Sequence, residues 1–175
     1  MSLINKYIYM EIIALALFVF SAFAAEHKIT KNQVPSAVLQ SFTKTFPNAK
    51  AESYATETKN GKTYYEIESK EGTISRDLLF EPNGKLVEME EMIPYDSLPA
   101  AVQDSIKTKY GKNSFVSAER ITKNNQITYG VVLKINNKKM EKTFNPDGSL
   151  ASKNTESLEE EKEPNETNEN QEEGK

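Results

Sequence analysis

The sequence of 175 residues contains no cysteine and a single histidine, His27. The lack of cysteine excludes disulfide bonds, a thiol lipid anchor and a thiol nucleophile. With only one histidine, Ser–His pairs and the usual zinc site of nitrogen and sulfur ligands have no support either. His27 is therefore interpreted as an ordinary exposed residue near the amino terminus.

Glycine-rich phosphate motifs and an excess of basic residues are also missing. Neither GxGxxG nor GxxxxGK occurs, so no nucleotide and no other cofactor is predicted. The net charge is −4, and the negative charge is concentrated after residue 150. A nucleic-acid-binding protein is expected to be basic, so nucleic acid is not a predicted partner.

No apolar run is long enough to span a bilayer. The longest, Ile12–Ala25, is shorter than the roughly 18 residues that a transmembrane helix needs. It follows Lys6 and contains the small residues of an A-x-A cleavage pattern in Ser21–Ala24. This pattern predicts a signal peptide over residues 1–24, and an uncleaved anchor is the alternative. We therefore expect an exported protein, periplasmic or secreted, with no stable membrane anchor after cleavage.

Residues 152–175 are rich in glutamate and nearly devoid of apolar side chains. Such a segment cannot bury enough surface to offset its chain entropy, so we predict a disordered acidic tail. It is either an interaction tail or a solvated terminus without a partner.

The chain between these ends contains an internal repeat. The heptapeptide FEPNGKL at 80–86 recurs as FNPDGSL at 144–150, and other positions match at the same offset. The matched structural positions are Pro35 and Pro99, Tyr65 and Tyr129, Phe80 and Phe144, and Gly84 and Gly148. A constant offset across apolar, proline and glycine positions indicates two copies of one supersecondary unit, over 25–94 and 95–151.

Each copy begins with a helical pattern and continues with alternation of period two. Residues 35–45 and 98–110 carry apolar side chains at helical spacing, with proline near the start of each helix. Alternating segments come next, separated by turn signals such as Asn60-Gly61. The predicted fold class is α+β: two tandem units, each one helix followed by a four-stranded antiparallel meander, with the helices packed on one face of the sheet.

The repeated heptapeptide is interpreted as a structural turn. Phe80 and Phe144 are expected in the core, and Leu86 and Leu150 are expected to resume core packing after each turn. A calcium loop is the alternative, but the segment lacks the regular series of oxygen ligands that such loops need.

Aromatic and charged side chains on the uncovered sheet face are candidate protein-binding residues. Tyr64 falls on the face opposite Tyr65, and Tyr54 is expected to join it. With the charges of Glu66 and Arg76 these tyrosines would form a patch typical of protein interfaces. Scattered surface aromatics are the alternative interpretation.

Carboxylates are the only candidates for chemistry. Glu88, Glu90 and Glu91 cluster on one predicted strand, and Glu66 and Glu68 share a face of another. A buried member of such a group could act as an acid or base. Alternating glutamates are more typical of a solvated strand face, so no catalytic residue and no metal ligand is predicted.

The pattern Val34-Pro35-x-x-Val38, Phe42 and Phe46-Pro47-x-Ala49 precedes a Tyr-containing strand and a Phe-x-x-x-Gly-x-Leu turn. This arrangement occurs twice over about residues 32–151 and resembles the PepSY-like family, small exported bacterial proteins related in fold to beta-lactamase-inhibitor protein. The resemblance implies tandem α+β units joined in one extended antiparallel sheet. It also implies a non-catalytic protein that binds or restrains other proteins such as peptidases, and it carries over no functional residue.

The predicted function is an exported, non-enzymatic binding module that uses the open face of its sheet, with an envelope or extracellular protein as partner. Two alternatives stay open. One is a small-ligand or lipid carrier with its ligand between sheet and helices. The other is a weak carboxylate-dependent enzyme.

Overall fold

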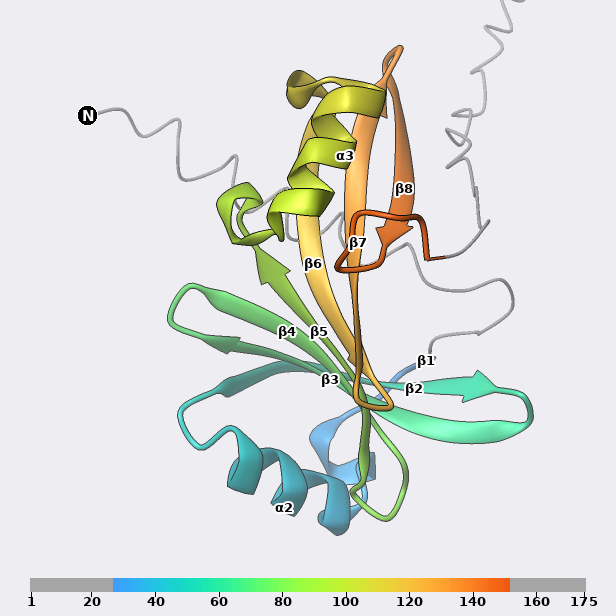
Figure 1. Ribbon diagram of the computed structural model, residues 1–175. Coiled ribbons are helices and arrows are strands. Elements are labelled where there is room, and N and C mark those ends of the chain that lie inside the picture. The colour runs from blue at the N-terminus through green and yellow to red at the C-terminus, as the bar shows by residue number, and fades with distance from the viewer. Residues whose placement is uncertain (1–26, 152–175) are drawn as a thin grey trace, which may run out of the picture.

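The computed structural model describes residues 27–151, and the predicted signal peptide and acidic tail lie outside that range. Its centre is one antiparallel sheet of eight strands in sequential order, which twists strongly from one end to the other (Figure 1). The strands are β1 (His27–Lys28), β2 (Lys50–Lys59), β3 (Lys62–Glu71), β4 (Ile74–Phe80), β5 (Leu86–Ile93), β6 (Phe115–Lys123), β7 (Gln126–Ile135) and β8 (Lys138–Phe144). The helices are α2 (Ser36–Thr45) and α3 (Ala100–Tyr110), with short 3-10 turns η2 (Lys31–Gln33), η3 (Tyr95–Ser97) and η4 (Lys112–Ser114).

The predicted pair of helix-plus-four-strand units is wrong. Residues 27–151 form a single eight-stranded sheet with two α-helices, and only β6, β7 and β8 come after α3. A single bridge between Phe144 and Leu150 stands in the place of the fourth strand. The physical reason lies in the sequence after each turn. Apolar and charged residues alternate from Leu86 onward, and this segment forms β5, which pairs with β4 and β6. No such alternation follows Leu150.

Leu150 also corrects a prediction about the core. Its side chain is 43% exposed, so it does not resume core packing as expected. Leu86, in contrast, packs against the core beside α2. The two copies of the heptapeptide therefore differ in the packing of their final leucine.

Both helices cover the same face of the sheet. Leu78, which packs in the core under α2, pairs with Met89 of β5. Met89 and Ile93 lie on one side of β5 because alternate residues of a strand point the same way. Ile93 pairs with Ala118, which packs in the core under α3. We call this side the helix-covered face and the opposite side the open face.

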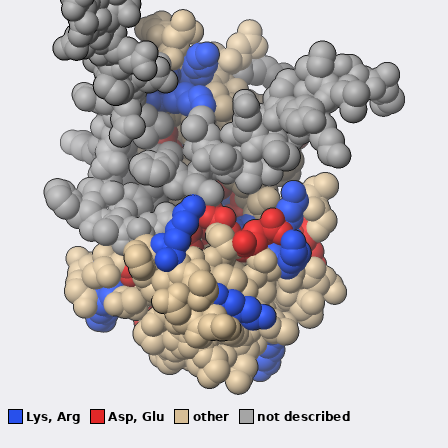
Figure 2. Space-filling model, turned by 180° about the vertical axis from the view of Figure 1, so that it is seen from behind, with Lys and Arg blue, Asp and Glu red and all other residues tan. Residues whose placement is uncertain are grey.

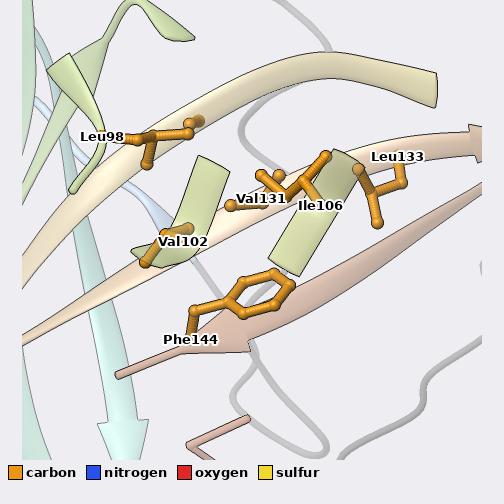
Figure 3. Close-up of a cluster of buried hydrophobic side chains, with 7 residues drawn as sticks. Leu98, Val102, Ile106, Val131, Leu133 and Phe144 are labelled. Atoms are coloured by element: carbon orange, nitrogen blue, oxygen red, sulfur yellow. The ribbon is translucent and has the colours of Figure 1, made fainter. Parts of the chain in front are cut away.

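Each helix has its own hydrophobic core on the helix-covered face. Phe80 and Phe144 are both fully buried, one in each core. The core under α2 is formed by Val34, Val38, Phe42, Ile67, Leu78 and Phe80. The core under α3 is formed by Leu98, Val102, Ile106, Ala118, Val131, Leu133 and Phe144, and Figure 3 shows Phe144 below the two helical residues Val102 and Ile106.

The repeated turns bring backbone against backbone. A Cβ added to Gly84 would lie 2.5 Å from the carbonyl oxygen of Ala37 in α2, and one added to Gly148 would meet the carbonyl oxygen of Ala101 in α3. The Ser105 hydroxyl donates a hydrogen bond to the Gly148 carbonyl at 2.7 Å. Glycine at these two positions therefore lets each turn dock on its helix.

Candidate binding surface

The open face carries buried apolar side chains beside carboxylates. Leu79 pairs with Glu66 and Glu88 across neighbouring strands, and Ile121 pairs with Glu90. Ala55, Leu79 and Ile121 are between 4% and 7% exposed, and they belong to neither of the two cores. Apolar residues are thus withdrawn from solvent on a face that no helix covers within residues 27–151.

The open face is concave. Lys59 of β2 lies 2.8 Å from Glu57 of the same strand and 3.9 Å from Glu88 of β5. Glu88 is in register with Ala55, four residues from Lys59, so in a flat sheet the two Cα atoms would lie roughly 19 Å apart, farther than extended lysine and glutamate side chains span. Strong twist and curl must therefore bring these strands toward one another on this side.

Four carboxylates meet on this face, and we call them the acidic cluster: Asp77, Glu88, Glu90 and Glu119. Asp77 of β4 pairs directly with Glu90 of β5, and Glu88 lies on the same side of β5. Glu119 of β6 pairs with Met92, one step diagonal to Glu90. Figure 2, seen from behind Figure 1, shows acidic atoms near the middle of the molecule with basic side chains beside them.

The surroundings make two members of the cluster hard to ionise. Burial, and after it the charges of Glu119, Glu88 and Asp77, raises the pKa of Glu90 from 4.5 to about 8, against the opposing charge of Lys59. Burial, and after it the charge of Glu141 and two cluster members, raises the pKa of Glu119 to about 8. Like charges in a poorly solvated site disfavour the charged form of each carboxyl group.

Glu88 leaves one oxygen without a partner. Its side chain is 4% exposed, and its Oε2 accepts a hydrogen bond from Lys123 Nζ at 2.7 Å. Its Oε1 is buried and has no hydrogen-bond partner. A buried acceptor without a donor costs free energy, and such an atom in a native structure calls for a donor from elsewhere.

Gly130 makes room for Glu119 on the neighbouring strand. The two residues pair directly across β6 and β7. A Cβ added to Gly130 would lie 2.6 Å from Glu119 Oε1. The carboxyl group of Glu119 therefore lies over the bare backbone of β7, and a side chain at this position would displace it.

The structure separates the four residues that the sequence suggests as one patch. Tyr64 and Glu66 lie on the open face, opposite Glu57 and Ala55. Tyr54 packs instead against the core under α2.

Arg76 is also on the helix-covered face, where it belongs to an ion-pair ladder between the two cores. Its guanidinium lies 5.4 Å from the ring centre of Phe46. It donates to Glu91 at 2.8 Å and to Glu71 at 3.0 Å, and Arg120 donates to the other oxygen of Glu91 at 2.7 Å. Arg76 thus joins β4 to β5 and is not part of the open face.

Because the pKa values of Glu90 and Glu119 are raised on folding, stability should fall as pH rises. Between about pH 4.5 and 8 the unfolded chain loses protons that the folded chain keeps, so the free energy of unfolding decreases with pH. Glu119→Gln should be more stable than wild type by up to about 4–5 kcal/mol at pH 8.5 and equal to it at pH 4. Urea unfolding at the two pH values measures this.

The control for that comparison is Glu52→Gln, which removes an exposed carboxylate paired with Lys50. It should change stability little at either pH. A Glu119→Gln variant that gains nothing at pH 8.5 would show that this carboxyl group ionises normally in the folded protein.

Within residues 27–151, no group of three or more histidine, cysteine or acidic side chains is arranged to hold a metal ion. No helix in the same range is long and apolar enough to cross a lipid bilayer.

Comparison with known proteins gives a consistent result for the fold. A family model described as "Putative beta-lactamase-inhibitor-like, PepSY-like" matches residues 23–88 and again residues 63–152. A search of curated proteins finds no match.

Several solved structures share the fold. A BLIP-like protein from Bacteroides fragilis is 21% identical, with a TM-score of 0.55 over 71% of this chain and 86% of its own. A protein from Bacteroides eggerthii described as one of the "putative periplasmic proteins" is 17% identical, with a TM-score of 0.60 over 71% and 89%. A DUF2874 family protein from Bacteroides ovatus is 19% identical, with a TM-score of 0.56 over 71% and 87%. At these identities the likeness shows the fold.

Proposed function

The chain belongs to the PepSY-like, beta-lactamase-inhibitor-like family, and from that membership we propose that it is an exported, non-enzymatic module that binds another protein with the open face of its sheet. The observation that carries the proposal is the composition of that face. Ala55, Leu79 and Ile121 are buried apolar residues on it, and carboxylates lie between them in the register of the strands. Protein interfaces likewise combine buried apolar side chains with polar ones.

The shape of the open face supports the same proposal. A concave sheet surface can enclose a protruding loop or side chain of a partner, and the contact between Lys59 and Glu88 requires such curvature. Tyr64 and Glu66 of β3 lie on the same open face, Glu66 between Ala55 and Leu79. Within residues 27–151 the helix-covered face is occupied by the two cores and their helices, whereas no helix covers the open face.

Export is supported by the signal pattern in residues 1–24. The relative from Bacteroides eggerthii is described as periplasmic, which agrees with that pattern. The partner would then be a protein of the envelope or the medium.

The proposal is tested by blocking the open face. Thr128 of β7 is half-buried and pairs with Ile121, so Thr128→Trp should fill the concavity without touching either core. Lys107→Trp on the exposed side of α3 is the matched control. Tagged protein is cross-linked in its own cells and purified, and the recovered proteins are compared by mass spectrometry.

We expect wild type and Lys107→Trp to recover the same discrete partner and Thr128→Trp to lose it, while all three keep similar melting temperatures. Equal recovery by all three variants, or recovery of no partner by wild type, would contradict the proposal. The melting temperatures show whether a loss comes from unfolding instead.

A further inference from the structure

We propose that the acidic cluster receives a lysine or arginine side chain of the protein partner, inserted between Glu90 and Glu119. The inference rests on the proposed function and adds the chemistry of the partner. The placement of the carboxylates, the cations near them and the unsatisfied oxygen of Glu88 support it.

Within residues 27–151, the ion pairs made by lysine and arginine leave two members of the cluster, Glu90 and Glu119, without a paired cation. Lys59 and Lys123 both approach Glu88, at 3.9 Å and 2.7 Å. No ion pair within residues 27–151 engages Glu90 or Glu119. Several negative groups held together by the register of three strands would repel one another when ionised, and a cation supplied from outside would relieve that repulsion.

The unpartnered Glu88 Oε1 is an independent sign that a donor is missing. This atom is buried and accepts no hydrogen bond, although the other oxygen of the same group is satisfied. Ammonium and guanidinium groups both carry several N–H donors, and a guanidinium can serve two carboxylates at once. A basic side chain from a partner is therefore the kind of donor that this oxygen lacks.

Gly130 keeps space at the other end of the cluster. Since an added Cβ would collide with Glu119 Oε1, the glycine allows that carboxyl group to lie over β7 and face the concavity. A metal ion is the less suitable occupant, because the acidic groups of the described residues are not arranged to hold one. An organic cation has less demanding geometry.

Binding of such a cation should depend on pH. Glu90 and Glu119 take up protons near neutral pH, and a partner cation would have to displace them. The charged groups that act on this pair are Lys59 on β2, Asp77 on β4, Glu88 on β5 and Glu141 on β8, and Lys123 on β6 pairs with Glu88. Affinity should therefore rise from about pH 6 to about pH 9.

The test uses a random peptide library displayed on phage, selected against the full protein purified from its own cells at about pH 8.5. Selected peptides are synthesised with a fluorescent label and titrated by anisotropy. We expect lysine or arginine at a fixed position of the selected peptides, and its replacement by norleucine should weaken binding about tenfold or more. The double variant Glu90→Gln/Glu119→Gln should weaken binding to a similar extent.

The charge-matched control is Asp96→Asn/Asp104→Asn, which removes two exposed carboxylates near or on α3. It should bind within about twofold of wild type. Gly130→Ala keeps the charge but displaces the Glu119 carboxyl group, so it should also weaken binding while leaving the melting temperature nearly unchanged.

Three results would overturn the inference: selected peptides without a common basic residue, equal binding by the Glu90→Gln/Glu119→Gln variant, or affinity that falls with rising pH. If one of these results is found but the selected peptides bind wild type and not the Thr128→Trp variant, the open face still binds proteins. Only the proposal of a basic side chain is then refuted. If Thr128→Trp binds every selected peptide as wild type does, or no peptide is recovered, the proposed function fails too.

Discussion

Replacing Phe80 or Phe144 with alanine is expected to lower the free energy of unfolding by about 3–5 kcal/mol in each case. Both rings are fully buried, one in the core under α2 and one in the core under α3. Removing a buried ring loses its transfer free energy and leaves a cavity that the strands and helix fill only in part. Urea unfolding followed by circular dichroism measures both losses.

The matched control is Leu150→Ala, at the last position of the second heptapeptide. Leu150 is 43% exposed, so its truncation should cost less than about 1 kcal/mol. The two phenylalanine variants should lose similar amounts if the two cores are equivalent. A loss below about 1 kcal/mol at either position would contradict the assignment of that ring to a packed core.

Gly84→Ala and Gly148→Ala are each expected to destabilise the protein by about 2–4 kcal/mol. Both glycines have positive φ, 86° and 80°, which strains any other residue. The added methyl group would also meet a helix carbonyl, that of Ala37 or Ala101. The turn would have to move away from its helix, and the core beneath would loosen. Thermal and urea unfolding measure the cost.

Two other glycines separate strain from contact. Gly61 and Gly72 also have positive φ, 73° and 60°, but an added Cβ at either would meet no atom within 4 Å. Gly61→Ala and Gly72→Ala should therefore cost only about 1 kcal/mol. Equal losses of stability at all four positions would mean that backbone strain accounts for the whole loss, and that the contact between turn and helix does not contribute to it.

The sequence predicts local structure well where a few residues decide it. Asn60-Gly61 predicts a two-residue turn, and both residues adopt the positive φ that such a turn needs. The apolar spacing of 35–45 and 98–110 predicts the helices, which begin one or two residues later, at Ser36 and Ala100. These features depend on neighbouring residues alone.

The number of strands in the second half was predicted wrongly because the repeat was extended one turn too far. The two copies match up to Leu86 and Leu150, the last residues of the two heptapeptides, and no further. Beyond it, β5 owes its length to pairing with both β4 and β6. The two heptapeptides form similar turns, but this similarity does not determine whether a strand follows the turn.

The faces of Tyr54 and Arg76 could have been predicted from the sequence. A two-residue turn at Asn60-Gly61 fixes the pairing of β2 with β3, and it places Tyr54 opposite the core residue Ile67. Arg76 precedes Leu78 by two residues, so it shares the face of that core residue. The face of each strand residue is found by counting alternate positions from a known core residue, and not from whether its own side chain is polar or aromatic.

The meeting of Glu90 and Glu119 could not have been predicted in the same way. Their strands are joined through α3, and nothing local in the sequence fixes how β5 pairs with β6. The raised pKa values depend on that pairing and on the burial that the curled sheet creates. Long-range register, and not composition, makes the acidic cluster.

A binding role for the open face is tested most directly by asking which side of the molecule touches a partner in the cell. A photo-reactive benzoylphenylalanine replaces Thr128 on the open face in one strain and Lys107 on α3 in another, and both strains are irradiated. We predict one discrete protein adduct from position 128 and none from position 107. An adduct from position 107 alone, or from neither, would contradict the assignment of the open face as the binding surface.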